Sequence, residues 1–95
     1  MFGNLTLSLP VVITKQGKRF IAYTPALDIS TSGTSLRDVQ KKFAEAAPLF
    51  LEELHDAGTL DDVLIELGWK KTAKKWAPPA VVNSHTIGFR APAFA

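Results

Sequence analysis

The chain has 95 residues, and a chain of this length has too little interior to divide between two cores, so residues 1–95 are expected to form a single domain. Hydrophobic residues make up 46% of the sequence and charged residues 21%, a balance typical of globular proteins and not of disordered segments. The absence of cysteine excludes disulfide scaffolds, zinc-thiolate sites and thiol nucleophiles. No apolar run approaches the roughly 20 residues of a membrane helix, and the first ten residues lack the basic start of a signal peptide. We therefore expect a cytoplasmic protein.

The net charge of +2 hides a strong segregation of charge along the chain. Residues 1–34 carry three basic residues against one acid, whereas residues 35–67 carry three basic residues against eight acids, which gives −5. Residues 68–95 carry five basic residues and no acid. The sequence thus predicts an acidic middle segment followed by a basic C-terminal segment.

Three strands are predicted in the first third of the chain. From residue 5 to residue 14 every second residue is leucine, valine or isoleucine, and the intervening positions are Thr6, Ser8, Pro10, Val12 and Thr14. This alternation is typical of a strand with one buried face. Since Pro10 has no N–H to donate, the paired part of this strand should begin there or carry a bulge. A turn at Gly17 leads to a second strand over residues 19–24, and residues 27–32 form a third. The predicted arrangement is an antiparallel β-β-β meander.

A long amphipathic helix should follow, with Ser35 or Thr34 as its N-cap and Asp38 completing a capping box. Its apolar positions recur at spacings of three and four: Leu36, Val39, Phe43, Ala46 or Ala47, Phe50 and Leu54. Pro48 inside this pattern predicts a kink or a restart, and Gly58 predicts its end. A second, short helix is expected over residues 59–67, a basic loop over residues 69–79 and a last strand over residues 84–91. The fold class is therefore predicted to be α+β.

No catalytic or metal constellation is evident in the sequence. The two histidines, His55 and His85, are far apart, and neither belongs to a His-x-x-x-His pair or to another pattern with metal-ligand spacing. The adjacent acids Asp61 and Asp62 stand at a predicted helix start, where the helix dipole explains them. We expect no enzymatic activity, no metal and no cofactor.

The segment from Trp69 to Trp76 is the most suggestive stretch outside the helices. Lysines neutralise phosphates and indoles stack on bases, so this segment offers nucleic-acid binding, RNA in particular, as an alternative function. The same residues also fit a loop whose indoles pack on the domain while the ammonium groups stay in water, and we favour that interpretation. The candidate nucleic-acid-binding residues are Trp69, Lys70, Lys71, Lys74, Lys75 and Trp76.

Two short motifs resemble the HicB-like antitoxin family. They are Ala22-Tyr23-x-Pro25-x-Leu27 in the second strand and Gly33-Thr34-Ser35-Leu36 at the helix entry, and the resemblance covers a core of about residues 9–57. It implies a truncated RNase H-like fold, in which the helix covers one face of the meander and the final strand lies beside the first. It also implies a non-catalytic protein that binds and neutralises a small mRNA-cleaving toxin of the HicA type. No DNA-binding module is expected, because the prolines and the strand pattern of residues 69–95 oppose one.

A toxin partner would be expected on the acidic helical surface, because complementary charge speeds encounter and sets register. The candidate partner-binding residues are Glu45, Glu52, Glu53 and Asp56. We also expect a homo-oligomer, a dimer or a tetramer, because a sheet with one covered face leaves apolar surface and unpaired edges.

Overall fold

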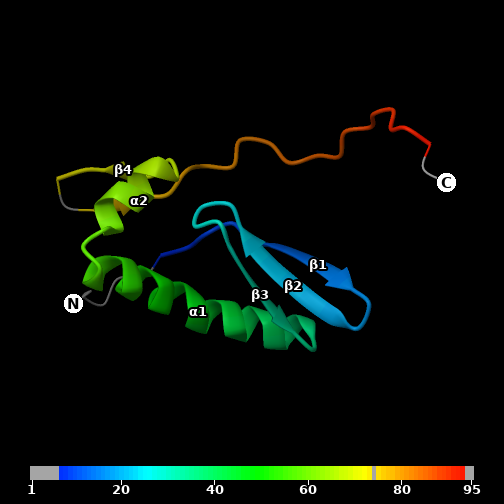
Figure 1. The fold of residues 1–95 in the computed structure, drawn as a ribbon, viewed down its shortest axis with the longest axis horizontal. Coiled ribbons are helices and arrows are strands. Elements are labelled where there is room, and N and C mark those ends of the chain that lie inside the picture. Colours follow the sequence, from blue (N-terminus) through cyan, green and yellow to red (C-terminus); the bar gives the residue numbers. More distant parts are fainter. Residues whose placement is uncertain (1–6, 74, 94–95) are drawn as a thin grey trace.

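The computed structural model describes residues 7–73 and 75–93 of the chain. A three-stranded antiparallel sheet lies against a long helix, and a short helix and a small hairpin follow at one end of that helix (Figure 1). The elements in chain order are β1 (Val12–Gln16), β2 (Arg19–Thr24), β3 (Ile29–Gly33), α1 (Leu36–Asp56), α2 (Leu60–Glu66), β4 (Lys70–Lys71) and β5 (Trp76–Ala77). The predicted α+β class and the meander are confirmed.

The sheet has the strand order β1-β2-β3, so β1 and β3 are its two edges. The turn between β1 and β2 depends on Gly17, whose φ of 59° is a conformation that side chains disfavour. The turn between β2 and β3 contains Asp28 at a φ of 52°, and the hydroxyl of Tyr23 donates a hydrogen bond of 2.9 Å to its carboxylate. Asp is one of the few residues that tolerate this region, because its short side chain bonds locally.

The start of α1 is fixed by a capping box shifted by one residue. The hydroxyl of Ser35 accepts a hydrogen bond from the Asp38 amide at 3.0 Å, as expected of an N-cap. The Asp38 carboxylate reaches back to the amide of Thr34 at 2.9 Å instead of to that of Ser35. The end of β3 lies so close to this turn that a Cβ on Gly33 would stand 2.7 Å from the Val39 nitrogen. Only glycine allows the strand to enter the helix at this distance.

Both helices end in the same glycine-dependent cap. At the end of α1, Gly58 has a φ of 74°, its amide bonds to the His55 carbonyl, and the Thr59 amide bonds to the Leu54 carbonyl at 2.9 Å. At the end of α2, Gly68 has a φ of 93°, and the Trp69 amide bonds to the Leu64 carbonyl at 2.9 Å. The predicted glycine ends of both helices are therefore confirmed, and the second cap directs Trp69 back onto α2.

The prediction of a restart at Pro48 is wrong, because α1 continues as one helix from Leu36 to Asp56 with Pro48 inside it. Packing of the apolar face outweighs the lost backbone hydrogen bond there. Among the described residues, neither helix is both long and apolar enough to span a membrane.

The core lies where α1, α2 and the β2–β3 turn meet. Ala26, Leu27, Leu64 and Trp69 form one buried cluster, with Phe50 among the half-buried side chains packed against it. Since the fully buried hydrophobic set among the described residues is small, the core of one chain is modest for this length. Within the sheet, α1 lies mainly over β3 and β2, which leaves β1 less covered.

Three boundaries differ from the sequence prediction. Pairing of β1 begins at Val12, two residues after Pro10, which cannot donate a ladder hydrogen bond. The predicted basic loop over residues 69–79 holds a small hairpin in which Lys71 pairs with Trp76. The predicted last strand over residues 84–91 is wrong for a single chain: this segment is exposed and unpaired, and β1 has no neighbour on its outer side among the described residues.

Candidate functional site

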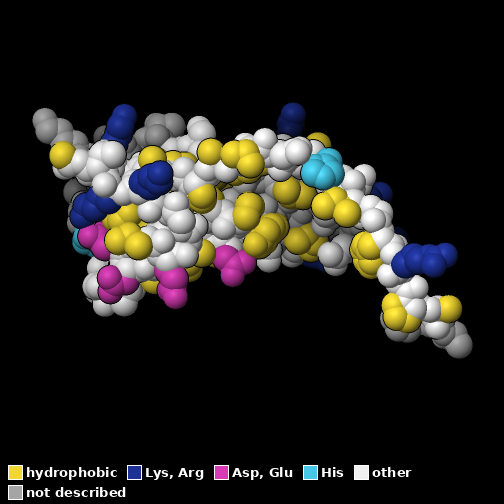
Figure 2. All heavy atoms as spheres, turned by 90° about the horizontal axis from the view of Figure 1, so that it is seen from above, with side chains coloured by type: hydrophobic (Ala, Val, Ile, Leu, Met, Phe, Trp, Pro, Cys, Tyr) yellow, Lys and Arg dark blue, Asp and Glu magenta, His cyan; other side chains and the backbone are white. Residues whose placement is uncertain are grey.

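The acidic surface of α1 has the placement that the sequence predicts. Glu45, Glu52, Glu53 and Asp56 are all exposed. Because an α-helix turns by about 100° per residue, Glu45, Leu49, Glu52 and Asp56 project in nearly one direction. We refer to these four residues as the acidic stripe, and Glu53 lies beside it. Figure 2 shows acidic side chains gathered toward the end of the molecule that holds α2.

The negative charge of the acidic stripe is poorly compensated. The sequence contains no lysine or arginine from residue 43 to residue 69. Among the described residues, no salt bridge joins Glu45, Glu52 or Glu53 to a cation, and Asp56 lies 3.6 Å from His55 Nδ1. The sequence analysis missed one member, Leu49, whose side chain is 58% exposed in the middle of the stripe. The acidic stripe therefore presents one exposed apolar side chain, that of Leu49, among three carboxylates.

The C-terminal lysine and tryptophan segment is largely engaged within the fold. The indole of Trp69 is 3% exposed, and its Nε1 donates a hydrogen bond of 2.7 Å to the carbonyl of Ala26. Trp69 therefore has no free ring face on which a base could stack, which corrects its placement among the candidate nucleic-acid-binding residues. Trp76 is half-buried against the same core cluster.

The lysines of this segment differ in their surroundings. The Nζ of Lys71 lies 2.8 Å from the Asp61 carboxylate and 5.4 Å from the centre of the Trp76 ring, so its charge is already paired. Lys70 and Lys75 are exposed, and Lys74 lies outside the described residues. The arrangement fits the packing interpretation of this segment better than a basic groove with stacking rings.

The side chains of Ser32, Thr34 and Ser35 before α1 are engaged in hydrogen bonds within the fold. The Ser32 hydroxyl accepts a hydrogen bond of 2.8 Å from Arg19, the Thr34 hydroxyl donates to Asp38, and Ser35 caps the helix. The Asp38 carboxylate accepts hydrogen bonds from the Thr34 amide and hydroxyl and lies 3.2 Å from the Lys42 ammonium. The bond from the Thr34 amide is the main reason that the pKa of Asp38 falls below its ordinary value. Asp38 is thus a structural carboxylate of the helix start.

The described residues contain no group of three or more potential metal ligands. His55 lies on α1 and His85 in the exposed C-terminal segment, and the sheet region carries Asp28 in a turn, bonded to Tyr23. The two histidines and Asp28 thus belong to different parts of the fold.

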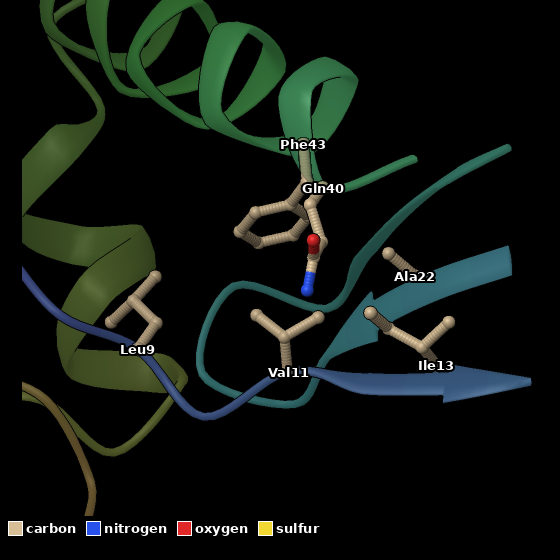
Figure 3. Close-up of a pocket in the computed structure, with 6 residues that line it drawn as sticks. All are labelled: Leu9, Val11, Ile13, Ala22, Gln40 and Phe43. Atoms are coloured by element: carbon tan, nitrogen blue, oxygen red, sulfur yellow. The ribbon is translucent and has the colours of Figure 1, made fainter. Parts of the chain in front are cut away.

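An open apolar hollow lies between β1 and α1 and was not anticipated from the sequence. It is lined by Leu9, Val11, Ile13, Ala22, Gln40 and Phe43. Figure 3 shows the side chains of Gln40 and Phe43 pointing from α1 toward Val11, which lies just before β1. The lining has one polar side chain, so the hollow can bury apolar groups but has no chemistry of its own. The alternation of hydrophobic residues in and just before β1 is the sequence feature from which this hollow could have been predicted.

Comparison with protein-family models, with curated proteins and with solved structures finds no match.

Proposed function

We propose that this chain is a non-catalytic binding protein of the HicB-like antitoxin type, which neutralises a small HicA-type mRNA-cleaving toxin in the cytoplasm. The observation that carries the proposal is the acidic stripe of α1, an exposed row of carboxylates around Leu49, with no lysine or arginine between Glu45 and Lys70 in the sequence. The meander with α1 against it supports a truncated RNase H-like fold class for the domain.

Charge gives the physical reason for this choice of partner. A protein that cleaves RNA must hold phosphates, so its substrate-binding face carries lysine and arginine. Carboxylates spaced along one face of a helix can occupy such a face in place of the phosphates. Leu49 would supply the apolar contact at the centre, where water is excluded and binding energy is concentrated.

The position of the carboxylates within α1 adds support. Glu53 and Asp56 lie in the last turn, where the helix dipole favours positive charge, so they oppose the stability of the isolated helix. His55 is the basic residue of that turn. Acids in an unfavourable position, left without salt bridges to lysine or arginine, are more easily explained by a partner than by folding.

The first experiment is affinity purification of the tagged full chain from its native host under mild conditions. The expected result is a small basic protein in stoichiometric amount, which cleaves mRNA when separated and stops when the chain is added back. An eluate that holds nuclease-sensitive nucleic acid and no such protein would overturn the proposal and favour the alternative of RNA binding through the C-terminal segment.

A pair of charge reversals then tests the surface. The variant Glu52→Lys/Asp56→Lys should weaken toxin binding by about 10- to 100-fold, because like charges would face each other across the interface. The matched control is Asp62→Lys/Glu66→Lys, which makes the same change in net charge at the same spacing on α2 and should change affinity by less than about threefold. Equal losses in the two variants would show a net-charge effect and not a specific surface.

Leu49 can be tested in the same way. Leu49→Ala should weaken binding by about tenfold and mainly speed dissociation. Ile65→Ala is the control, because Ile65 is a similarly exposed aliphatic side chain on α2, at 60%. If both substitutions leave affinity unchanged, the acidic stripe acts by long-range attraction alone and is not the docked surface.

A further inference from the structure

Three features of the structure belong together: an unpaired strand edge, an apolar hollow beside it, and an extended C-terminal segment. The outer side of β1 has no partner strand among the described residues. The hollow under that edge presents Val11, Ile13 and Phe43. Residues 81–93 are exposed throughout, and they include Ile87 at 73% and Phe89 at 84%. We infer that residues 84–91 of a second copy of this chain bind along the β1 edge and close the hollow, so that two chains exchange these segments.

The sequence of the segment fits an edge strand. Ile87 and Phe89 alternate with Thr86 and Gly88, so both apolar side chains fall on one face when the segment is extended. The same alternation runs through Val11, just before β1, and Ile13 within it, and both line the hollow. A register that sets Ile87 opposite Ile13 and Phe89 opposite Val11 directs both apolar side chains of the segment into the hollow.

Charge indicates that the added strand is antiparallel to β1. Lys15, Lys18 and Arg19 gather at the hairpin end of β1. A parallel strand in the same apolar register would bring Arg90 to that end, where like charges repel. An antiparallel strand sets Arg90 near Pro10, away from these residues.

The exposed surface of the chain has the size that an interface requires. A compact monomer of 10.3 kDa exposes about 5,400 Å², whereas this chain exposes 7678 Å². The excess of roughly 2,300 Å² is well above the ~800 Å² that each partner contributes to a standard interface. The radius of gyration agrees, at 16.1 Å against about 12 Å for a compact chain of this length. Two exchanged segments would bury much of this excess.

The exit of the segment favours exchange between chains over a return to its own sheet. Pro79 lies beside Gly68, where a Cβ on the glycine would be 3.6 Å from the proline ring. Pro78 and Pro79 together hold the backbone extended at this point. From there the segment runs along the long axis of the molecule, away from α2 (Figure 1). Exchange of identical segments is a low-cost route to a dimer.

The mass of the full chain in solution is the first test. Sedimentation velocity should give a mass of two chains for the natural protein, and Ile87→Asp/Phe89→Asp should shift it to the 10.3 kDa of one chain. Val82→Asp is the matched control, because Val82 is 94% exposed in the same segment but outside residues 84–91, and it should leave the dimer intact. A natural protein that is monomeric, or a dimer that both variants leave unchanged, would overturn the inference.

A second measurement distinguishes exchange from folding back. Because the chain has no cysteine, Ser84→Cys provides a single attachment site for a spin label. The spin-labelled variant, without isotope enrichment, is then mixed with the natural chain enriched in ¹⁵N. Exchange predicts broadening of the amide signals of Val12–Gln16 in the ¹⁵N chain. If these signals broaden only in a sample whose chains carry both the spin label and ¹⁵N, and not in the mixture, the segment pairs with β1 of its own chain and the inference is overturned. Both tests use the protein without any toxin, so their outcome is independent of the proposed function.

Discussion

The indole Nε1 of Trp69 donates a hydrogen bond of 2.7 Å to the carbonyl oxygen of Ala26, 43 residues earlier in the chain, and both residues are buried. This bond ties the β2–β3 turn to the segment that follows α2. The glycine cap at Gly68 makes it possible, because it turns the chain so that the indole lies over Leu64 and reaches the turn. A small core is thereby closed by a single aromatic residue.

Trp69→Phe should lower the free energy of unfolding by about 1–3 kcal/mol, because the Ala26 carbonyl would stay buried without a hydrogen-bond donor. Trp69→Ala should cost more, about 3–5 kcal/mol, because it also leaves a cavity. Urea denaturation followed by circular dichroism measures both. Trp76→Phe is the control: this ring is only half-buried, so its replacement should cost less than Trp69→Phe. Equal losses at the two tryptophans would contradict the assignment of a special role to Trp69.

Gly33→Ala should destabilise the fold by about 1–3 kcal/mol, because the new methyl group would stand 2.7 Å from the Val39 nitrogen and 2.8 Å from an Asp38 carboxylate oxygen. Thermal unfolding measures the loss. Gly88→Ala is the matched control, since nothing lies within 4 Å of a Cβ at Gly88. If the two alanine variants melted at the same temperature, the close approach of β3 and α1 would carry no strain.

The order of elements from β1 to α2 was predictable from the sequence because it depends on local signals. Alternation in β1 and β2, the spacing of apolar residues in α1 and the glycine at each helix end all act within a few residues. Of the kink or restart predicted at Pro48, the restart does not occur, since packing of an apolar face can hold a helix together across a local break signal.

The candidate surfaces were predictable only in part. The carboxylates of the acidic stripe follow from composition, and helical spacing sets Leu49 away from the apolar positions, but neither feature distinguishes a binding surface from a solvated helix face. Trp69 and Trp76 looked alike as candidates for stacking, yet one is buried and the other half-buried, because Trp69 alone follows a helix-ending glycine. The segment 84–91 carries a strand pattern but has no partner strand among the described residues of one chain.

Asp28→Gly should lower the pKa of Tyr23 toward its ordinary value of 10.0, because the hydrogen bond to the Asp28 carboxylate is the main cause that raises it. Glycine keeps the φ of 52° accessible, so the turn itself is preserved. The chain has one tyrosine, which makes an absorbance titration specific for this group. Asp56→Gly, far from Tyr23 at the end of α1, should leave the titration unchanged. An unaltered pKa in Asp28→Gly would mean that the hydrogen bond does not persist in solution.

The Asp38 carboxylate should give the fold a measurable dependence on acid pH. Its pKa is lowered in the folded protein, chiefly by the Thr34 amide and then by Lys42, so the ionised form is bound more tightly in the folded than in the unfolded state. The ionised Asp38 carboxylate therefore makes its full contribution to the free energy of unfolding above the ordinary aspartate pKa of 3.8. This contribution is lost as the pH falls through the lowered pKa of the folded protein.

The test compares the natural protein with Asp38→Asn in thermal unfolding across the acid range. The natural protein should melt at a higher temperature above pH 3.8, and the difference should shrink as the pH falls below that value. Glu45→Gln is the control, because this exposed carboxylate lies on the same helix without a salt bridge among the described residues, and the variant should follow the natural curve. A difference between the natural protein and Asp38→Asn that stays constant with pH would show that Asp38 stabilises the helix start by shape and not by its charge.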